Sequence, residues 1–291
     1  MSASVLLSAT ELSPVEEAYQ ILDSAIEQYA PFGLYSCFSG GDDSLATAIL
    51  TSQHPAFAGC VHVNTGIGVE LTRQFVRETC REQGWPLFEL HATPGEYRRI
   101  VLKDGFPGPA AHKFVYARLK ERPLRKFLAE QKQGRSRLAR MGLVTGVRKQ
   151  ESVRRMGVVR PVQKDKERSF VWVAPLIHWS REQVREFIAA AGLQRNPVSP
   201  LLGMSGECLC GAFAQPGELQ RLDEHFPEVS NRIARLEAEA LVRGVHAVWD
   251  EPPAEAEPVV APFDPEEFCL SLCSGCELRG KRRKRGAGVS C

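Results

Sequence analysis

A turn rich in glycine and hydroxyl side chains joins a short apolar run, residues 34–38, to a helical pattern. Backbone N–H groups at such glycines can approach an anion, and the helix that follows adds partial positive charge at its N-terminus. Serine hydroxyls there can donate hydrogen bonds to phosphate oxygens. The turn consists of Ser39, Gly40, Gly41, Asp42, Asp43 and Ser44. These residues predict a phosphate-binding loop, although the G-x-x-x-x-G-K-[ST] pattern of a Walker A loop is absent.

Asp43 is the candidate catalytic side chain in this loop. A carboxylate beside a phosphate group would repel it unless a cation lies between the two. We therefore expect a magnesium ion at Asp43, because Mg²⁺ binds through one or two carboxylates together with phosphate oxygens.

The last third of the chain contains a second set of candidate ligands, six of the nine cysteines. They are Cys208, Cys210, Cys269, Cys273, Cys276 and Cys291. The C-x₃-C-x₂-C triplet at 269–276 plus one thiolate from the earlier pair would supply the four ligands of a [4Fe–4S] cluster. A C-x-C pair with a distant C-x-x-C pair would also suit a structural zinc ion. Free thiols are a third alternative, and Cys291 is a spare ligand, a mobile thiol or a residue with no role.

The other three cysteines, Cys37, Cys60 and Cys80, fall in elements that we expect to form the core, so we interpret them as buried structural thiols. Apolar runs predict strands at 34–38, 60–63, 87–90, 142–145 and 170–174. Helical periodicity predicts helices at 13–30, 44–50, 69–83 and 112–131, another from Ser180, and two within 217–243. Strands that alternate with helices indicate an α/β fold with a doubly wound, mostly parallel sheet. In such a sheet the ligand lies at the carboxyl ends of the strands.

Five segments, in this order, resemble motifs of the PP-loop ATP pyrophosphatases, a family that includes the phosphoadenosine phosphosulfate (PAPS) reductases. The loop at 39–44 resembles S-G-G-x-D-S, and residues 63–72 resemble D-T-G-x-x-x-x-E-T. Residues 143–152 resemble T-G-x-R-x-x-x-S, 174–179 resemble P-L-x-x-W, and 196–199 resemble N-P-L-H. The resemblance covers about residues 30–215.

The resemblance implies roles for particular residues. It places Asn64, Thr65 and Gly66 against the adenosine of a bound nucleotide. It places Gly146 and Arg148, with Arg154 just beyond, at the phosphate or sulfate end, where guanidinium groups bind oxyanions in a bidentate manner. With Asp43, Arg148 and Arg154 are the candidate catalytic residues.

The sequence departs from the family at several positions. Asp42 stands where relatives usually have lysine, and Asn64 where they have aspartate. The cysteine pair that iron–sulfur members carry before K-x-x-P-L falls on Val115 and Tyr116, while S-x-G-C-x-x-C matches the segment 205–210 with one residue fewer. The E-C-G-x-H motif, which carries the nucleophilic cysteine of the reductases, is absent.

The resemblance therefore implies ATP cleavage to AMP and pyrophosphate, which adenylates an oxygen that sulfur then replaces. Among relatives that lack the reductase cysteine, those of DNA phosphorothioation systems are the most similar, because they pair a PAPS-reductase-like ATP pyrophosphatase with a cluster. ATP, a sulfur donor such as a cysteine desulfurase, and DNA or another nucleic acid are the expected partners. A sulfonucleotide reductase that releases sulfite is one alternative. A nucleotide- or nucleic-acid-binding subunit without catalysis is another.

The whole-chain composition is that of an ordinary globular protein. The 291 residues include 37 Lys and Arg against 35 Asp and Glu, so the net charge is only +2. Positive residues nevertheless concentrate at 113–155 and 279–285, and the latter run could bind a polynucleotide by counterion release. No signal peptide and no run of about 18 apolar residues is present, which favours a cytoplasmic protein. We expect a nucleotide-binding domain at 1–215 and a helical, cysteine-bearing region at 216–291.

Overall fold

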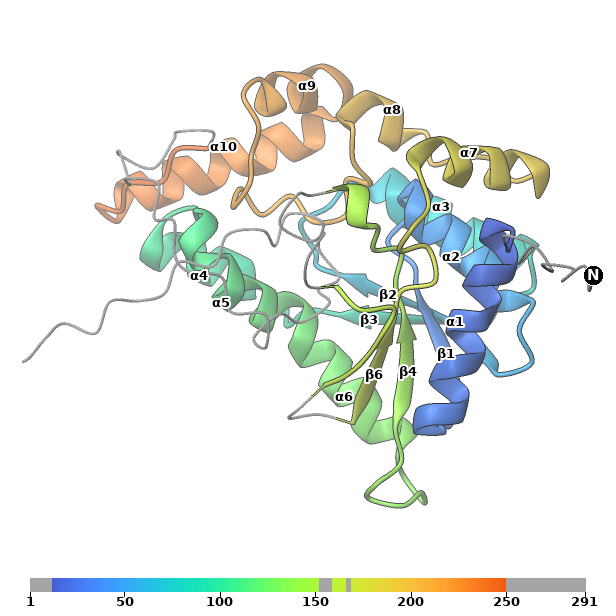
Figure 1. Cartoon of the computed structure of the whole chain (residues 1–291). Helices are drawn as coiled ribbons and strands as arrows, with labels where there is room; N and C mark the ends of the chain where they lie inside the picture. Colours follow the sequence, from blue (N-terminus) through green and yellow to red (C-terminus); the bar gives the residue numbers. More distant parts are fainter. Residues whose placement is uncertain (1–11, 152–158, 166–168, 250–291) are drawn as a thin grey trace, which may run out of the picture.

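The computed structural model describes residues 12–151, 159–165 and 169–249, which surround a six-stranded sheet (Figure 1). The strands are β1 (Leu34–Cys37), β2 (Phe57–Asn64), β3 (Leu87–His91), β4 (Met141–Val144), β5 (Val162–Lys164) and β6 (Phe170–Val173). Their order is β3-β2-β1-β4-β6-β5, and all pairs are parallel except β5 with β6. The predicted doubly wound, mostly parallel α/β sheet is confirmed.

The central strand β1 pairs with β2 on one side and with β4 on the other. Leu34 faces Phe57 in the first pair and Gly142 in the second. The chain thus winds outward from β1 through β2 to β3, and then crosses back to β4. The loops after β1 and β4 leave the sheet in different directions, and the crevice between them is where this fold class binds ligands.

Helices cover both faces of the sheet and its carboxyl edge. They are α1 (Pro14–Tyr29), α2 (Asp42–Ser52), α3 (Glu70–Glu82), α4 (Glu96–Asp104), α5 (His112–Tyr116), α6 (Arg122–Gln131), α7 (Arg181–Ala190), α8 (Val198–Leu202), α9 (Glu218–His225) and α10 (Pro227–Val242). Both capping boxes expected from the sequence are formed. Ser13 pairs with Glu16 at the start of α1, and Ser180 pairs with Gln183 at the start of α7.

The core lies between the sheet and its helices. In Figure 1, α6 lies on one side of the strands and α1 and α2 on the other. The ring of Tyr35 on β1 lies 5.5 Å from that of Phe127 on α6, and the ring of Phe88 on β3 lies 4.9 Å from it. Cys37, Cys60 and Cys80 are all buried, as predicted. Burial raises the pKa of the Cys37 thiol to about 12, so this thiol stays protonated at neutral pH.

The helices α9 and α10 pack over the loop that follows β2. Val69 shares an apolar cluster with Leu222, and Ile67 shares another with Leu236 and Ala240. The predicted pair of helices is therefore present and covers the loop between β2 and α3. The proposed domain boundary at residue 215 stays a prediction.

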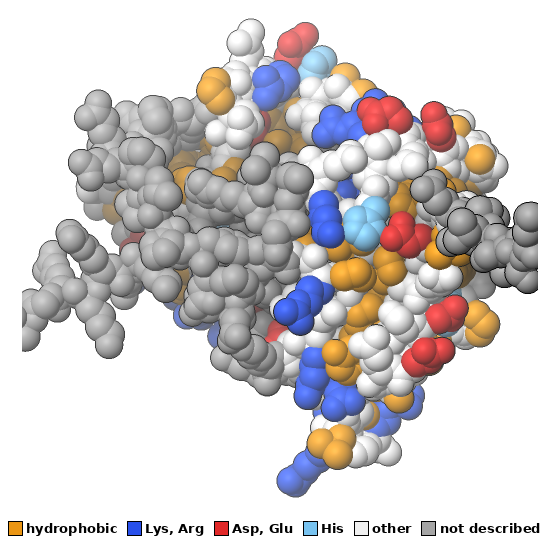
Figure 2. Space-filling view, viewed as in Figure 1, with side chains coloured by type: hydrophobic (Ala, Val, Ile, Leu, Met, Phe, Trp, Pro, Cys, Tyr) orange, Lys and Arg blue, Asp and Glu red, His pale blue; other side chains and the backbone are white. Residues whose placement is uncertain are grey.

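Charge is distributed unevenly over the surface. On the face drawn in Figure 2, lysine and arginine side chains lie through the centre and lower part, and acidic side chains gather at the right. The small net charge of the chain thus conceals a local separation of sign. Within the described ranges, no helix has the length and apolarity that a membrane span needs.

Candidate functional site

A cavity of about 560 Å³ opens at the carboxyl ends of β1 and β4. Its walls come from the loop after β1, the loop after β4, helix α7 and the segment 203–208. Eight of the residues singled out from the sequence line it: Ser39, Gly41, Asp42, Asp43, Ser44, Gly146, Arg148 and Cys208. The structure therefore brings together the phosphate loop, the T-G-x-R segment and one cysteine of the C-x-C pair.

The phosphate loop is held in place by hydrogen bonds around the start of α2. Ser44 donates from Oγ to the Gly41 carbonyl at 2.8 Å, and the backbone N–H of Ser39 donates to Ser44 Oγ at 3.3 Å. The side chain of Asn196 donates from Nδ2 to the Gly40 carbonyl at 2.9 Å. The first turn of α2 is thereby fixed at the cavity wall, where its N-terminal dipole favours an anion.

The carboxylate of Asp43 accepts two hydrogen bonds from Arg148. Arg148 Nε lies 2.8 Å from Oδ1 and Nη2 lies 3.2 Å from Oδ2, a bidentate arrangement. The Arg148 side chain is only 4% exposed. Gly146 allows this approach, because a Cβ atom there would lie 2.6 Å from the backbone of Asp43. Two of the three candidate catalytic residues, Asp43 and Arg148, are thus held together at the wall of the cavity.

The other loop carboxylate, Asp42, is also paired with arginine. Arg195 reaches it from the loop after α7, with Nη2 2.5 Å from Oδ2 and Nε 2.9 Å from Oδ1. Arg185 on α7 lies 3.7 Å away. The hydrogen bond from Arg195 to Asp42 is the largest cause of a raised pKa at Arg195. The negative charge that the sequence introduces into the loop is therefore balanced from outside the loop.

Several cations that were not predicted as site residues also line this cavity: Lys120, Arg181, Arg185 and Arg195. Two weak signals point to the arginines. Arg181 and Arg185 lie four residues apart after the Ser180 cap, so they share one face of α7. Arg195 directly precedes the N-P motif at Asn196.

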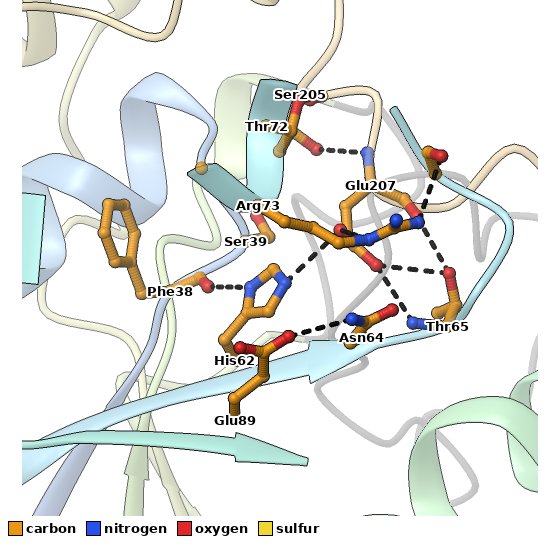
Figure 3. Close-up of polar contacts among 12 residues, drawn as sticks. Phe38, Ser39, His62, Asn64, Thr65, Thr72, Arg73, Glu89, Ser205 and Glu207 are labelled. Carbon is orange, nitrogen blue, oxygen red and sulfur yellow. Dashed lines mark hydrogen bonds and ion pairs between the residues drawn. The ribbon is translucent and has the colours of Figure 1, made fainter. Parts of the chain in front are cut away.

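The residues at the end of β2, which the resemblance places against adenosine, lie outside the cavity lining and contact other parts of the protein. Asn64, Thr65 and Gly66 are not among the residues that line the cavity. Asn64 donates from Nδ2 to Glu89 Oε1 at 2.8 Å (Figure 3). Thr65 donates its backbone N–H to Glu207 Oε1 at 3.0 Å and its hydroxyl to the Glu207 carbonyl at 2.8 Å. The first two side chains thus engage protein partners that connect β2 to neighbouring segments.

Glu207 is the centre of a buried ionic cluster that the sequence did not reveal. Its Oε2 lies 3.3 Å from His62 Nε2 and 3.7 Å from Arg73 Nε, and all three side chains are at most 9% exposed (Figure 3). His62 also contacts the carbonyl of Phe38 through Nδ1 at 2.8 Å. The cluster links the segment that carries Cys208 to β1, β2 and α3.

The two cysteines of the C-x-C pair lie at different depths. Cys208 is partly exposed at the cavity, whereas Cys210 is buried and its carbonyl accepts a hydrogen bond from the Tyr97 hydroxyl at 2.9 Å. Among the described residues, no group of three or more His, Cys, Asp or Glu side chains could hold a metal ion. Cys269, Cys273 and Cys276 lie outside the described residues, as do Cys291 and Arg154. The metal site therefore stays a prediction.

A family model described as the phosphoadenosine phosphosulfate reductase domain matches residues 33–200, well over half of the chain. No curated protein sequence matches.

The chain is also similar in part to three solved structures. The PAPS reductase of Candida auris, in a phosphate complex, is 17% identical, with 69% of this chain and 93% of that chain covered and a TM-score of 0.47. An FMN adenylyltransferase of Candida glabrata, with FMN and an ATP analogue, is 14% identical, with 65% and 59% covered and a TM-score of 0.48. The NMN synthetase of Francisella tularensis is 14% identical, with 78% and 96% covered and a TM-score of 0.44.

Proposed function

The chain belongs to the phosphoadenosine phosphosulfate reductase domain family, and we propose that it is an ATP pyrophosphatase of that family. It would cleave ATP to AMP and pyrophosphate and so adenylate an oxygen of a second substrate. The terminal persulfide sulfur of a donor such as a cysteine desulfurase would then attack and displace AMP, and a second thiol would reduce the resulting S–S bond, which frees the donor and leaves the sulfur on the product. An acceptor in DNA, as in phosphorothioation, is the form of this proposal that the basic run at 279–285 favours.

The observation that carries the proposal is the composition of the cavity. The glycine-serine loop at the start of α2 faces a wall that holds Arg148, Arg185 and Arg195. A volume of about 560 Å³ lies within the range of small-ligand sites and suits a nucleotide. Guanidinium groups and helical N–H groups that converge on one cavity are suited to a polyphosphate.

The residues of the cavity can act on the α–β phosphate bond without a covalent enzyme intermediate. The substrate oxygen would attack the α-phosphorus, and negative charge would build up on the departing pyrophosphate. Arg148, fixed by Asp43, would stabilise that charge without a reorganisation step, which is the most effective form of electrostatic catalysis. Ser39 and Ser44 would orient the phosphate oxygens.

Magnesium fits this site through Asp43. The carboxylate has about four lone-pair positions, of which Arg148 uses two, and a nucleotide-bound Mg²⁺ needs only one or two carboxylates from the protein. When bound, the ion would neutralise charge on the pyrophosphate.

The described cysteines alone do not fit an iron–sulfur cluster, because Cys208 and Cys210 supply two thiolates where four are needed. The cluster, or a zinc ion in its place, would require the cysteines at 269–276. An anaerobic absorbance spectrum with metal analysis of the full chain distinguishes these cases. About four irons and a shoulder near roughly 400 nm support a cluster, whereas one zinc or no metal contradicts it.

The reductase alternative lacks the motif that carries its nucleophilic cysteine. Sulfite release from a sulfonucleotide needs a reactive thiol, and the E-C-G-x-H motif is absent from the sequence. Cys37, which does line the cavity, is held protonated by burial and is a poor substitute.

Pyrophosphate release from ATP tests the proposal. The purified full chain should release pyrophosphate when Mg²⁺ and a DNA acceptor are present, and Ser39→Ala or Asp43→Ala should reduce the rate by about 10²-fold or more. The exposed residues Ser136 and Asp104 provide matched controls, since alanine there leaves the cavity unchanged. A wild-type chain that neither binds nor cleaves ATP rules the proposal out.

A further inference from the structure

The position next to Asp43 in the phosphate loop is acidic, yet the structure surrounds it with positive charge. Asp42 is 16% exposed and accepts two hydrogen bonds from Arg195, while Arg185 lies 3.7 Å from the same carboxylate. The three side chains together carry a net charge of +1. All three line the cavity beside Ser39, Gly41 and Ser44.

We propose that Asp42 is a positioning residue, which holds Arg195 and Arg185 so that they bind the β- and γ-phosphates of the nucleotide. The proposal rests on the proposed ATP pyrophosphatase function and adds the residues that recognise the polyphosphate. The cations come from α7 and the loop after it, instead of from the phosphate loop itself. Asp42 would thus contact the arginines and not the nucleotide.

The geometry of Arg195 supports this role. A guanidinium group has five N–H donors, and Asp42 engages one on Nε and one on Nη2. The donors on Nη1 are not used in either contact, and the side chain is 35% exposed at the cavity. A planar guanidinium fixed along one edge by a carboxylate presents its other edge in a defined direction, as bidentate oxyanion binding requires.

A simpler explanation is that Asp42 only stabilises the N-terminus of α2. Acidic side chains in the first helical turn do so by about 0.3–1 kcal/mol. In that case the carboxylate would face the incoming phosphates and repel them. The two explanations therefore predict opposite changes in nucleotide affinity when the Asp42 charge is removed. Binding should become stronger if Asp42 only stabilises the helix, and weaker if Asp42 positions the arginines.

The test measures the dissociation constants of ATP and AMP, with Mg²⁺, for the full-length chain and three variants. We expect Arg195→Gln to raise the Kd for ATP about tenfold or more while the Kd for AMP changes by less than about twofold. Asp42→Asn should raise the Kd for ATP several-fold, since Arg195 loses the partner that orients it. Arg243→Gln, an exposed arginine at the end of α10, is the matched control and should change neither constant.

The outcomes separate the two proposals. Tighter ATP binding by Asp42→Asn, or an unchanged Kd for ATP in Arg195→Gln, overturns this inference while leaving the ATP site in place. Failure of the wild-type chain to bind ATP overturns the function and this inference with it. Normal AMP binding and an unchanged Tm show that a variant is folded. If Asp42→Asn does not fold, Arg195→Lys serves in its place. Lysine keeps the positive charge but lacks the planar guanidinium group that donates two parallel hydrogen bonds, so ATP binding should still weaken.

Discussion

Arginines from distant parts of the chain bind both aspartates of the loop after β1. Arg148 lies 105 residues from Asp43, and Arg195 lies 153 residues from Asp42. A carboxylate that balances the charge of an arginine also fixes the orientation of the guanidinium group. At the residue scale, the phosphate loop therefore organises the cations around it.

The first prediction concerns the stability of the Asp43–Arg148 pair. Asp43→Asn removes the negative charge that accepts two hydrogen bonds from the buried Arg148, and we expect a loss of about 3 kcal/mol in the free energy of unfolding. The double variant Asp43→Asn with Arg148→Gln should recover part of that loss. Urea unfolding measures both. The exposed i,i+4 pair Lys126–Glu130 is the control, where Glu130→Gln should cost less than about 1 kcal/mol. Equal losses at the two sites would contradict the prediction.

The second prediction concerns pH and Glu89. Hydrogen bonds from Arg77, with a smaller one from Asn64, lower the pKa of the Glu89 carboxyl to about 2. A lowered pKa in the folded state stabilises the fold above the ordinary value of 4.5, and this stabilisation is lost as pH falls from 4.5 towards 2. Glu89→Gln should thus destabilise the protein at pH 7 by about 1 kcal/mol, since Arg77 is 42% exposed to solvent.

The difference between Glu89→Gln and the wild type should shrink below pH 4.5 in unfolding experiments. The exposed residue Glu224 is the control, and its glutamine variant should show no such trend. A difference for Glu89 that stays constant with pH would contradict the assignment.

At the element scale, the segment 205–208 is joined closely to the loop between β2 and α3. Val69 donates its N–H to the Gly206 carbonyl at 2.9 Å, and Thr72 donates its hydroxyl to the Ser205 carbonyl. The buried cluster around Glu207 adds ionic contacts to this connection. The position of Cys208 at the cavity therefore depends on the end of β2.

The third prediction tests this connection with two glycines. A Cβ atom on Gly68 would lie 2.3 Å from the Glu207 carbonyl oxygen, whereas one on Gly108 would meet no atom within 4 Å. Gly68→Ala should therefore destabilise the protein by about 1–3 kcal/mol. Gly108→Ala should be neutral or slightly stabilising, by up to about 1 kcal/mol. Thermal unfolding measures both, and similar Tm values for the two variants would contradict the close packing.

The sequence predicted the elements with strong local signals and missed those without them. Helices α1 and α7 follow from capping boxes, and β1, β4 and β6 follow from short apolar runs. The short elements α8 and β5 have five and three residues, too few for a clear period. Helix α4 lacks a side-chain cap at its start, and the edge strand β5 has no buried residue.

The residues of the candidate site also fall into those that a local motif predicted and those that it did not. The phosphate loop and Arg148 belong to local motifs, so the sequence located them. Arg195 and Glu207 act through partners more than 140 residues away, which no local pattern could indicate. The side chains of Asn64 and Thr65 bind Glu89 and Glu207, because the fold brings those acids to the end of β2, and the predicted contact of both residues with adenosine stays a prediction.

At the scale of the whole molecule, the net charge is only +2, but positive side chains are concentrated at one cavity. Helix α7 and the loops after β1 and β4 bring cations to one cavity at the carboxyl edge of the sheet. The helices α9 and α10 cover the neighbouring loop and leave that cavity open. This arrangement is suited to a phosphate-bearing substrate that enters from the carboxyl edge.

The identity of the products formed from ATP tests the central claim most directly. The purified full chain, supplied with ATP, Mg²⁺, a DNA acceptor and a sulfur donor, should form AMP and pyrophosphate in equal amounts, as separated by chromatography. The Asp43→Ala variant should form neither above background. Formation of ADP and phosphate, or of sulfite from PAPS with no reaction of ATP, would contradict the account.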